Sequence, residues 1–195
     1  MKISPKTIVY CEGKDKPGNN GEEKGFDAKV LNNIFGEKHH DTLFVSSGGN
    51  TELDQRSEIA LKILSKVFSD IEILVFKDRD VSSGKLNDEN DRQEYLENNP
   101  DNFRIMKRWE IENYLFDKDV LKKYCSEKSK LFNEGKYDNC VNDIINDSIK
   151  DNCSIIKSCC DISTSINPEK FKLNLSKLIT EDMNVYKELE ECIIF

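Results

Sequence analysis

Acidic side chains follow two apolar segments of this 195-residue chain. Glu12 comes directly after the apolar run 7–11, and Asp78 and Asp80 follow the apolar run 71–76. On an extended chain, residues two positions apart point to the same face, so Asp78 and Asp80 are expected to lie side by side. Two like charges held close together repel each other unless a cation lies between them. The pattern therefore predicts a divalent-metal site that includes Glu12, Asp78 and Asp80.

Carboxylate oxygens are hard ligands, which favour Mg²⁺ or Mn²⁺ over zinc. A metal ion held by them polarises a phosphoryl oxygen and lowers the pKa of bound water, which suits the hydrolysis of phosphodiester bonds. Asp78 to Asp80 could instead form a solvated turn that caps the next segment. The strand-end position of Glu12 favours the metal site, because functional groups gather at the carboxyl ends of parallel strands.

Strand-like apolar runs alternate with segments of helical periodicity over the first half of the chain. The runs near 7–11, 43–46, 71–76 and 103–107 predict strands, and a short helix is expected over 91–97. Two longer helices are predicted from apolar faces, made of Phe26, Val30, Ile34 and Phe35 in the first and of Leu53, Ala60, Leu64, Val67 and Phe68 in the second. This alternation predicts an α/β, Rossmann-like fold with a mostly parallel sheet flanked by helices.

The end of the chain has helical patterns only. Residues 1–116 are expected to form a metal-binding catalytic domain, and residues 117–195 a helical C-terminal appendage. Three apolar stripes predict its helices: Val141, Ile144, Ile145 and Ile149; Phe171, Leu175, Leu178 and Ile179 after an N-cap at Asn167 and a first-turn Pro168; and Val185, Leu189, Cys192 and Ile193. Such stripes are expected to form ordinary core.

Charge and cysteine content restrict the function. The formal net charge of −8 argues against a free-standing, high-affinity nucleic-acid binder, although a partner could supply the basic surface. No apolar run reaches the ~20 residues that span a bilayer, and the N-terminus has no signal-peptide pattern, so a cytoplasmic protein without a membrane partner is expected. The seven cysteines form no C-x-x-C pair, which favours buried reduced thiols over a zinc site.

The acids and their order resemble the Toprim domain. In that family a glutamate–glycine turn follows the first strand, as in Tyr10-Cys11-Glu12-Gly13 here, and an Asp-x-Asp follows the third, as in Asp78-Arg79-Asp80. Residues 108–116 are similar to a segment of Toprim nucleases that are paired with ABC-type ATPases in phage defence. OLD-family nucleases share the same domain. The resemblance covers residues 5–116 and implies that Glu12 is a metal ligand or general acid/base and that Asp78 and Asp80 are Mg²⁺ ligands.

Further candidate residues lie near these motifs. Residues 14–24 look like an insertion relative to the family, so Asp15 or Asp27 could supply another acid, and Asp27 could equally be a helix cap. Glu110 and Glu112 are possible additional acids if the chain is extended there, and surface acids otherwise.

Two other features near the predicted site have open roles. Lys77, Arg79 and Arg108 could contact phosphate or balance the acids. The segment 46–50 could allow close backbone approach or form only a turn.

The expected function is a Mg²⁺-dependent nuclease that cuts DNA or RNA and acts in antiviral defence with an ABC-type ATPase. An oligomer is left open by the sequence. The alternatives are a non-catalytic interaction module that docks on an ATPase, and an RNA-maturation enzyme. A P-loop ATPase and a dinucleotide-binding protein are disfavoured, because the chain has no G-x-x-x-x-G-K-[ST] and no G-x-G-x-x-G after the first strand.

Overall fold

The computed structural model describes residues 5–13, 22–64, 66–68, 70–79, 89–162 and 165–194. The chain divides into two compact units, Met1–Lys77 with Glu94–Ile105, and Asp78–Gln93 with Met106–Phe195. These units do not coincide with the predicted division at residue 116, because residues 106–116 belong to the helical unit.

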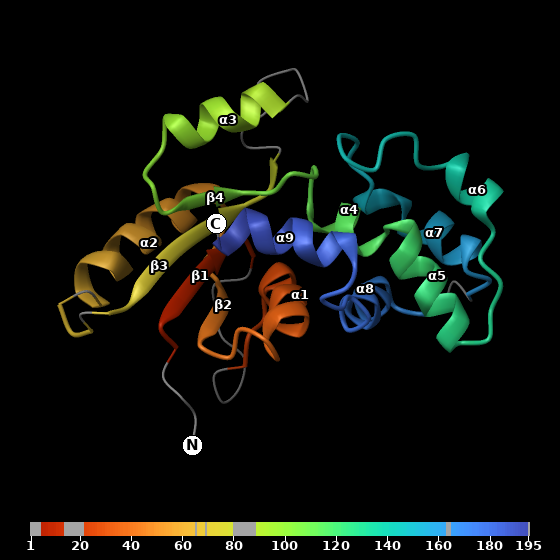
Figure 1. Cartoon of the computed structure of the whole chain (residues 1–195), viewed down its shortest axis with the longest axis horizontal. Helices are drawn as coiled ribbons and strands as arrows, with labels where there is room; N and C mark the ends of the chain where they lie inside the picture. The colour runs from red at the N-terminus through yellow and green to blue at the C-terminus, as the bar shows by residue number, and fades with distance from the viewer. Residues whose placement is uncertain are drawn as a thin grey trace. The chain divides into compact units, whose positions relative to one another are not determined.

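The predicted strands are present and form one four-stranded parallel sheet in the order β2-β1-β3-β4 (Figure 1). They are β1 Thr7–Cys11, β2 Thr42–Ser46, β3 Glu72–Lys77 and β4 Phe103–Ile105, so the fourth is shorter than the predicted 103–107. At the carboxyl edge, Cys11 lies opposite Ser46 on one side and Phe76 on the other. The predicted α/β, Rossmann-like class with a parallel sheet is confirmed.

Strand order creates a switch point between β1 and β3. These strands are neighbours, but the chain leaves β1 toward β2 on one side and leaves β3 toward β4 on the other. In open parallel sheets, a crevice for ligands forms outside the carboxyl ends of such a pair. Residues that directly follow β1 and β3 are therefore placed where a site is expected.

Helices α1 Phe26–Phe35 and α2 Asn50–Leu64 connect the first three strands, and α3 is Glu89–Glu97. α1 packs on β1 and β2, whereas α2 packs on β1 and β3. Because the two connections run in opposite directions along the sheet, right-handed crossovers place α1 and α2 on opposite faces. The core of this unit includes Val30, Ile34 and Phe35 of the predicted α1 face.

The predicted apolar face of the second helix is only partly correct. Leu53 is fully buried, but Val67 and Phe68 are 68% and 46% exposed. The prediction required a helix that continues to Phe68, whereas α2 ends at Leu64 and the chain turns there, with Phe68 N–H donating to Leu64 O. The apolar side chain of Ile63, in the last turn of α2, is also exposed.

The orientation of α2 can be tested with two matched truncations. Leu53→Ala is expected to lower the free energy of unfolding by about 2–4 kcal/mol, because it removes a buried side chain and leaves a cavity. Ile63→Ala removes a similar volume from an exposed position and should change it by less than about 0.5 kcal/mol. Urea denaturation followed by circular dichroism measures both. Equal effects would contradict the burial of Leu53.

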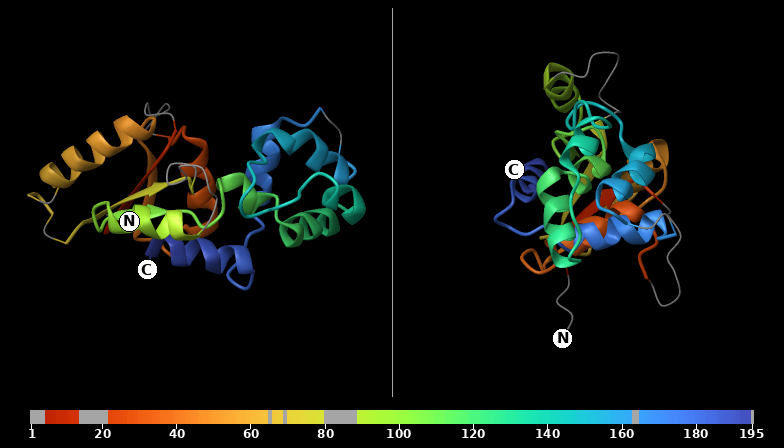
Figure 2. Two further views of the ribbon diagram at one scale, coloured as in Figure 1. Left: turned by 90° about the horizontal axis from the view of Figure 1, so that it is seen from above. Right: turned by 90° about the vertical axis from the view of Figure 1, so that its right-hand side faces the viewer.

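The second unit contains helices and loops, but no strand, in its described residues (Figure 2). None of the described helices is long and apolar enough to cross a membrane. Its described α-helices after residue 105 are α4 Ile111–Leu115, α5 Lys118–Glu127, α6 Glu134–Asp138, α7 Cys153–Cys159, α8 Pro168–Ser176 and α9 Asn184–Ile194. A short 3-10 helix, Lys150–Asn152, directly precedes α7.

Of the three predicted C-terminal stripes, the one at Val185 to Ile193 lies on α9, whereas the one at Phe171 to Ile179 lies on α8 only as far as Leu175, because α8 ends at Ser176. Asn167 is the N-cap of α8, where its side chain accepts the N–H of Lys170, and Pro168 is the first helical residue. Phe171 and Leu175 of α8 are buried, and so is Ile179, which follows the helix. All four residues of the α9 stripe are buried as well. Sequence patterning and capping therefore predicted this part of the fold.

The predicted helix through Val141, Ile144, Ile145 and Ile149 is wrong. The segment is a series of turns in which Asp143 Oδ1 accepts the N–H groups of Ile145 and Asn146, at 2.8 and 3.1 Å. Such local bonds offer the backbone an alternative to the helical ladder. Val141 and Ile149 are nevertheless buried, whereas Ile145 is exposed.

All seven cysteines are free, and all except the half-buried Cys140 are buried. Burial raises the pKa of the Cys153 and Cys192 thiols above the ordinary value. The prediction of buried thiols is confirmed for every cysteine except Cys140.

Candidate metal centre

Two acidic residues stand at the switch point of the sheet. Glu12 directly follows β1, and Asp78 directly follows β3. The two strands are paired with Cys11 opposite Phe76. One oxygen of each carboxylate, Oε1 of Glu12 and Oδ1 of Asp78, is inaccessible to solvent. Burial disfavours a charged carboxylate unless donors or a cation compensate, and oxygen donors of this type are those that Mg²⁺ and Mn²⁺ prefer.

The other predicted ligands cannot be placed in the same way. Asp80 and Asp15 lie outside the described residues. Because β3 ends at Lys77, the strand alternation that was expected to align Asp78 with Asp80 does not extend to them. Within the described part of the chain, no group of three or more His, Cys, Asp or Glu side chains is arranged to hold a metal ion.

A glycine pair connects the ends of β1 and β2. Gly13 and Gly48 exchange two backbone hydrogen bonds, Gly13 N to Gly48 O at 3.0 Å and Gly48 N to Gly13 O at 2.9 Å. Both have positive φ, 134° for Gly13 and 98° for Gly48, a conformation that residues with a Cβ rarely adopt. Gly13 thus has a conformation suited to the tight turn predicted behind Glu12, while residues 14–21 lie outside the described part of the chain. The segment 46–50 combines both predicted roles, since it turns into α2 and approaches Gly13 closely.

Glu23 is an acid at this edge that was not predicted. Its Oε2 accepts the N–H of Ser46 at 3.0 Å, and its Oε1 accepts the N–H of Gly25 at 2.6 Å and the hydroxyl of Ser46. The side chain thus fixes the start of α1 to the end of β2. No spacing rule links residues this far apart in sequence, so the pattern carried no signal for it.

Asp27 lies in the first turn of α1 and is half-buried. The N-cap of α1 is Gly25, so Asp27 lies inside the helix, two residues after the cap position. The alternative interpretation of Asp27 as a cap is therefore wrong, and its role as a metal ligand stays a prediction.

Close packing at Gly25 gives a stability prediction. A Cβ built at Gly25 would overlap the side chain of Ser46, so Gly25→Ala should lower the free energy of unfolding by about 1–3 kcal/mol. In α6, a Cβ at Gly135 would meet only Asn133 Oδ1, at 3.9 Å. Gly135→Ala should therefore be neutral or stabilising by about 0.5–1 kcal/mol. Thermal unfolding of the two variants measures the difference, and equal midpoints would refute the close approach of Gly25 to β2.

Glu110 has a structural role in the second unit. It is the N-cap of α4, in a capping box with Asn113. Its Oε1 accepts the Ser148 hydroxyl at 3.0 Å and the N–H groups of Ile149 and Lys150 at 2.9 and 2.8 Å. These bonds hold the loop after residue 147 against the start of α4. Glu110 is buried, so the alternative of a surface acid is wrong.

Glu112 is also held within the second unit. Its Oε1 lies 2.7 Å from Lys172 Nζ, and both side chains are largely buried. The pair joins α4 to α8. Glu112 lies within α4 and Glu110 at its N-cap, so the extended conformation that would put both on one face is absent.

The predicted phosphate contacts are buried rather than surface residues, with exposures of 3% for Lys77, 3% for Arg79 and 6% for Arg108. Arg79 Nη1 donates to Lys107 O at 2.7 Å and to Asn146 Oδ1 at 3.0 Å. Lys77 Nζ lies 5.0 Å from the centroid of the Phe103 ring. These contacts are with a backbone carbonyl, an amide and an aromatic ring, and they join segments of the fold. The two predicted roles, contact with phosphate and balance of the acids, stay predictions for Lys77 and Arg79.

Arg108 is held by several groups. Its guanidinium makes a two-pronged pair with Glu188, through Nε and Nη2 at 3.2 Å each, and Nη1 bonds Asp117 Oδ2 and Asn113 O at 2.9 Å. Its Cζ lies 5.0 Å from the centroid of the Tyr114 ring. Burial opposes the charge, but Glu188 and Asp117 outweigh it and raise the pKa of Arg108.

Taken together, the sheet order and the strand-end acids define an α/β protein with a candidate site at a topological switch point. Comparison of the chain with family models, with curated proteins and with solved structures finds no match. The resemblance to the Toprim domain therefore stays a prediction from the sequence motifs.

Proposed function

We propose that the chain is a Mg²⁺- or Mn²⁺-dependent nuclease that hydrolyses phosphodiester bonds in DNA or RNA. One observation carries the proposal. Glu12 and Asp78 directly follow the two adjacent strands of the switch point, and each has a carboxylate oxygen removed from solvent. The Toprim-like order of Glu12-Gly13 and Asp78-Arg79-Asp80 adds independent support from sequence.

The donor set suits a hard divalent cation. Glu12, Asp78 and Asp80 would hold the metal, with Asp15 and Asp27 as further candidate ligands. When bound there, Mg²⁺ would polarise a phosphoryl oxygen and lower the pKa of a coordinated water.

Other parts of the mechanism belong to the chain itself. Glu12 would accept a proton from the attacking water or donate one to the leaving oxygen, the general acid/base role that the resemblance implies. The Gly13–Gly48 bridge holds the backbone directly after Glu12, which limits movement of its Cα. A group that transfers protons must be positioned within hydrogen-bond reach of its substrate, so this restraint favours catalysis.

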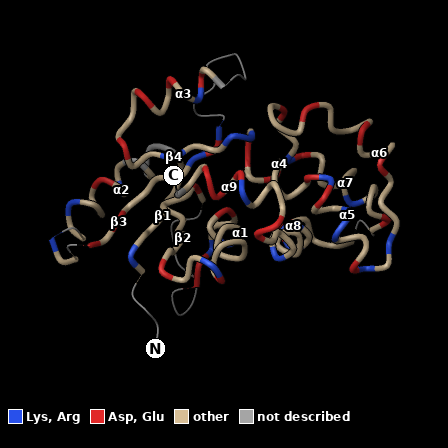
Figure 3. The backbone as a smooth tube through the Cα atoms, in the orientation of Figure 1, with Lys and Arg blue, Asp and Glu red and all other residues tan. Residues whose placement is uncertain are grey.

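A partner is part of the proposal. Acidic residues are spread over both units in Figure 3, and the net charge is −8. Arg79 after β3 and Arg108 after β4 are buried, and the more exposed Lys107 is paired with Glu191. Affinity for nucleic acid comes mainly from phosphate contacts with cations, so a separate protein would have to supply them. An ABC-type ATPase, in a cytoplasmic antiviral defence system, is the partner that the resemblance implies.

A cleavage assay tests the proposal. The purified chain, alone and with an ABC-type ATPase encoded beside it, is incubated with plasmid, single-stranded DNA and tRNA in the presence of Mg²⁺. We expect cleavage of at least one substrate, which EDTA abolishes and Mn²⁺ or Mg²⁺ restores. Intact substrates in every combination, with the chain shown to be folded by circular dichroism, would refute the nuclease.

A further inference from the structure

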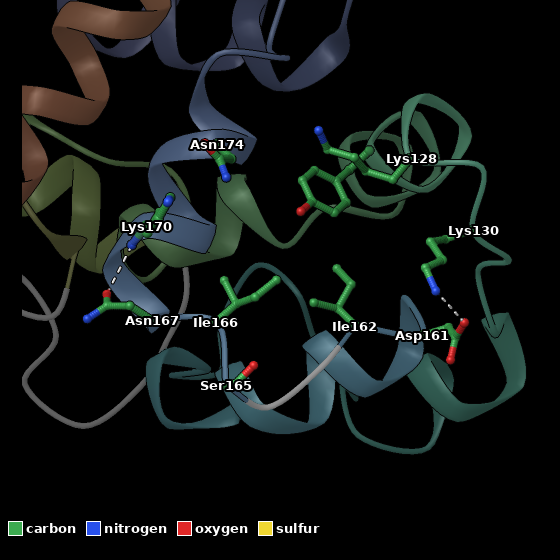
Figure 4. A pocket seen from close by; sticks show the side chains of 10 residues that line it. Lys128, Lys130, Asp161, Ile162, Ser165, Ile166, Asn167, Lys170 and Asn174 are labelled. Atoms are coloured by element: carbon green, nitrogen blue, oxygen red, sulfur yellow. Dashed lines mark hydrogen bonds and ion pairs between the residues drawn. The ribbon is translucent and has the colours of Figure 1, made fainter.

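A second candidate site lies in the helical unit, in a cavity of about 820 Å³ next to α5 and α8 (Figure 4). This volume lies within the roughly 300–1,000 Å³ of pockets that bind small molecules. Its described lining combines basic, amide and apolar side chains. The cavity lies wholly within the second unit and includes neither Glu12 nor Asp78.

The charge of this cavity is opposite to that of the chain. Three lysines line it, Lys128, Lys130 and Lys170, but only one acid, Asp161. Asp161 Oδ2 lies 3.0 Å from Lys130 Nζ, so that pair is internally balanced. No described residue forms an ion pair with Lys128 or Lys170. Two ammonium groups are thus left to bind an anion, in a chain whose net charge is −8.

The cavity also has an apolar surface beside its lysines. Ile162 and Ile166 project side by side into the cavity (Figure 4), and the ring of the buried Tyr124 also lines it. Burial raises the pKa of Tyr124, so its phenol stays protonated and can donate a hydrogen bond. Asn174, whose amide forms no hydrogen bond with a described residue, lines the cavity as well. Such amides both donate and accept, which suits the polar edge of a heterocycle.

We propose that this cavity binds a small phosphorylated molecule with a flat, largely apolar organic group, of the nucleotide class. The phosphate would bind Lys128 and Lys170, and the organic group would lie on Ile162, Ile166 and Tyr124. Charge-assisted hydrogen bonds from lysine to phosphate are the strong part of such a site, and the apolar surface provides the remainder. The proposal does not rest on the nuclease activity.

Isothermal titration calorimetry of the whole chain with AMP, adenosine and inorganic phosphate tests it. EDTA is present in every titration, so a divalent cation at Glu12 and Asp78 cannot contribute. We expect saturable binding of AMP, with adenosine and phosphate each at least about tenfold weaker, because each offers only one half of the ligand. No saturable binding of AMP, or binding of phosphate as tight as that of AMP, would overturn the proposal.

Two double variants locate the binding. Lys128→Gln with Lys170→Gln should weaken AMP binding by about tenfold or more, because it removes both phosphate contacts. Lys24→Gln with Lys66→Gln removes the same charge from exposed positions of the first unit and should leave the affinity within twofold. Equal weakening by the two pairs would mean that AMP senses only net charge, and the cavity would be excluded.

The variant Ile166→Ser tests whether the apolar surface of the cavity contacts the organic group of the ligand. This variant should weaken AMP binding but leave the weak binding of phosphate unchanged. An unchanged affinity for AMP would overturn the assignment of the organic group to the isoleucine surface.

Discussion

Replacing Arg108 with methionine is expected to lower the free energy of unfolding by about 3–5 kcal/mol, which would be a large part of the stability of a domain of this size. The reason is the removal of one partner from a buried charge network. Methionine fills part of the same volume, but it leaves Glu188 and Asp117 without the guanidinium that now bonds both. The loss should therefore exceed that of an ordinary truncation.

Two further variants distinguish the loss of the Arg108 hydrogen-bond network from the loss of one positive charge. Arg108→Lys keeps the charge but lacks the planar fork that bonds Glu188 through two nitrogens, so an intermediate loss is expected. Lys62→Gln breaks the exposed pair with Glu58 one helical turn away and should leave the unfolding midpoint unchanged. Urea denaturation measures all three. A neutral Arg108→Met would refute the structural role and favour the earlier interpretation of Arg108 as a phosphate contact.

The parts of the fold that were predictable are those set by local patterns. Asn167 and Pro168 match the residue preferences for the N-cap and the first position of a helix, and α8 starts there. The apolar runs that became β1 to β4 carry the period and length of buried strands. The stripe from Val141 to Ile149 had an equally good helical period, but the Asp143 side chain accepts the backbone N–H groups of Ile145 and Asn146, and the segment forms turns instead.

Residues of the candidate site could be predicted where their position relative to a strand is enough to place them in the fold. An acid directly after a parallel strand must lie at the carboxyl edge, so Glu12 and Asp78 could be placed from sequence. Glu23 and Glu110 could not, because their partners lie far away in the chain, at Ser46 for one and at Ser148 to Lys150 for the other. Carboxylates that bond distant backbone leave no periodic signal.

If the proposed nuclease is correct, Glu12→Gln should reduce the rate of cleavage by about 10²–10⁴-fold, the usual contribution of a general acid or base. Asp78→Asn should reduce it at least about 100-fold, because even residues that only support a metal ligand contribute 10–100-fold. Both substitutions keep the size and shape of the side chain, so the packing at the ends of β1 and β3 should be retained. Initial rates at saturating Mg²⁺ measure the loss.

The matched control is Asp70→Asn, which makes the same chemical change at an exposed acid that precedes β3 instead of following it. Its cleavage rate should equal that of the unmodified chain, because the amino end of a parallel strand lies at the edge opposite to the site.

Calorimetry with Mn²⁺ separates the two roles of the acids. Asp78→Asn and Asp80→Ala should each weaken the binding of Mn²⁺. If the Mn²⁺ binding constant were unchanged in both variants, the proposed metal centre would be refuted even if the chain cleaved nucleic acid. Loss of Mn²⁺ binding without any cleavage by the unmodified chain would instead leave a metal-binding interaction module.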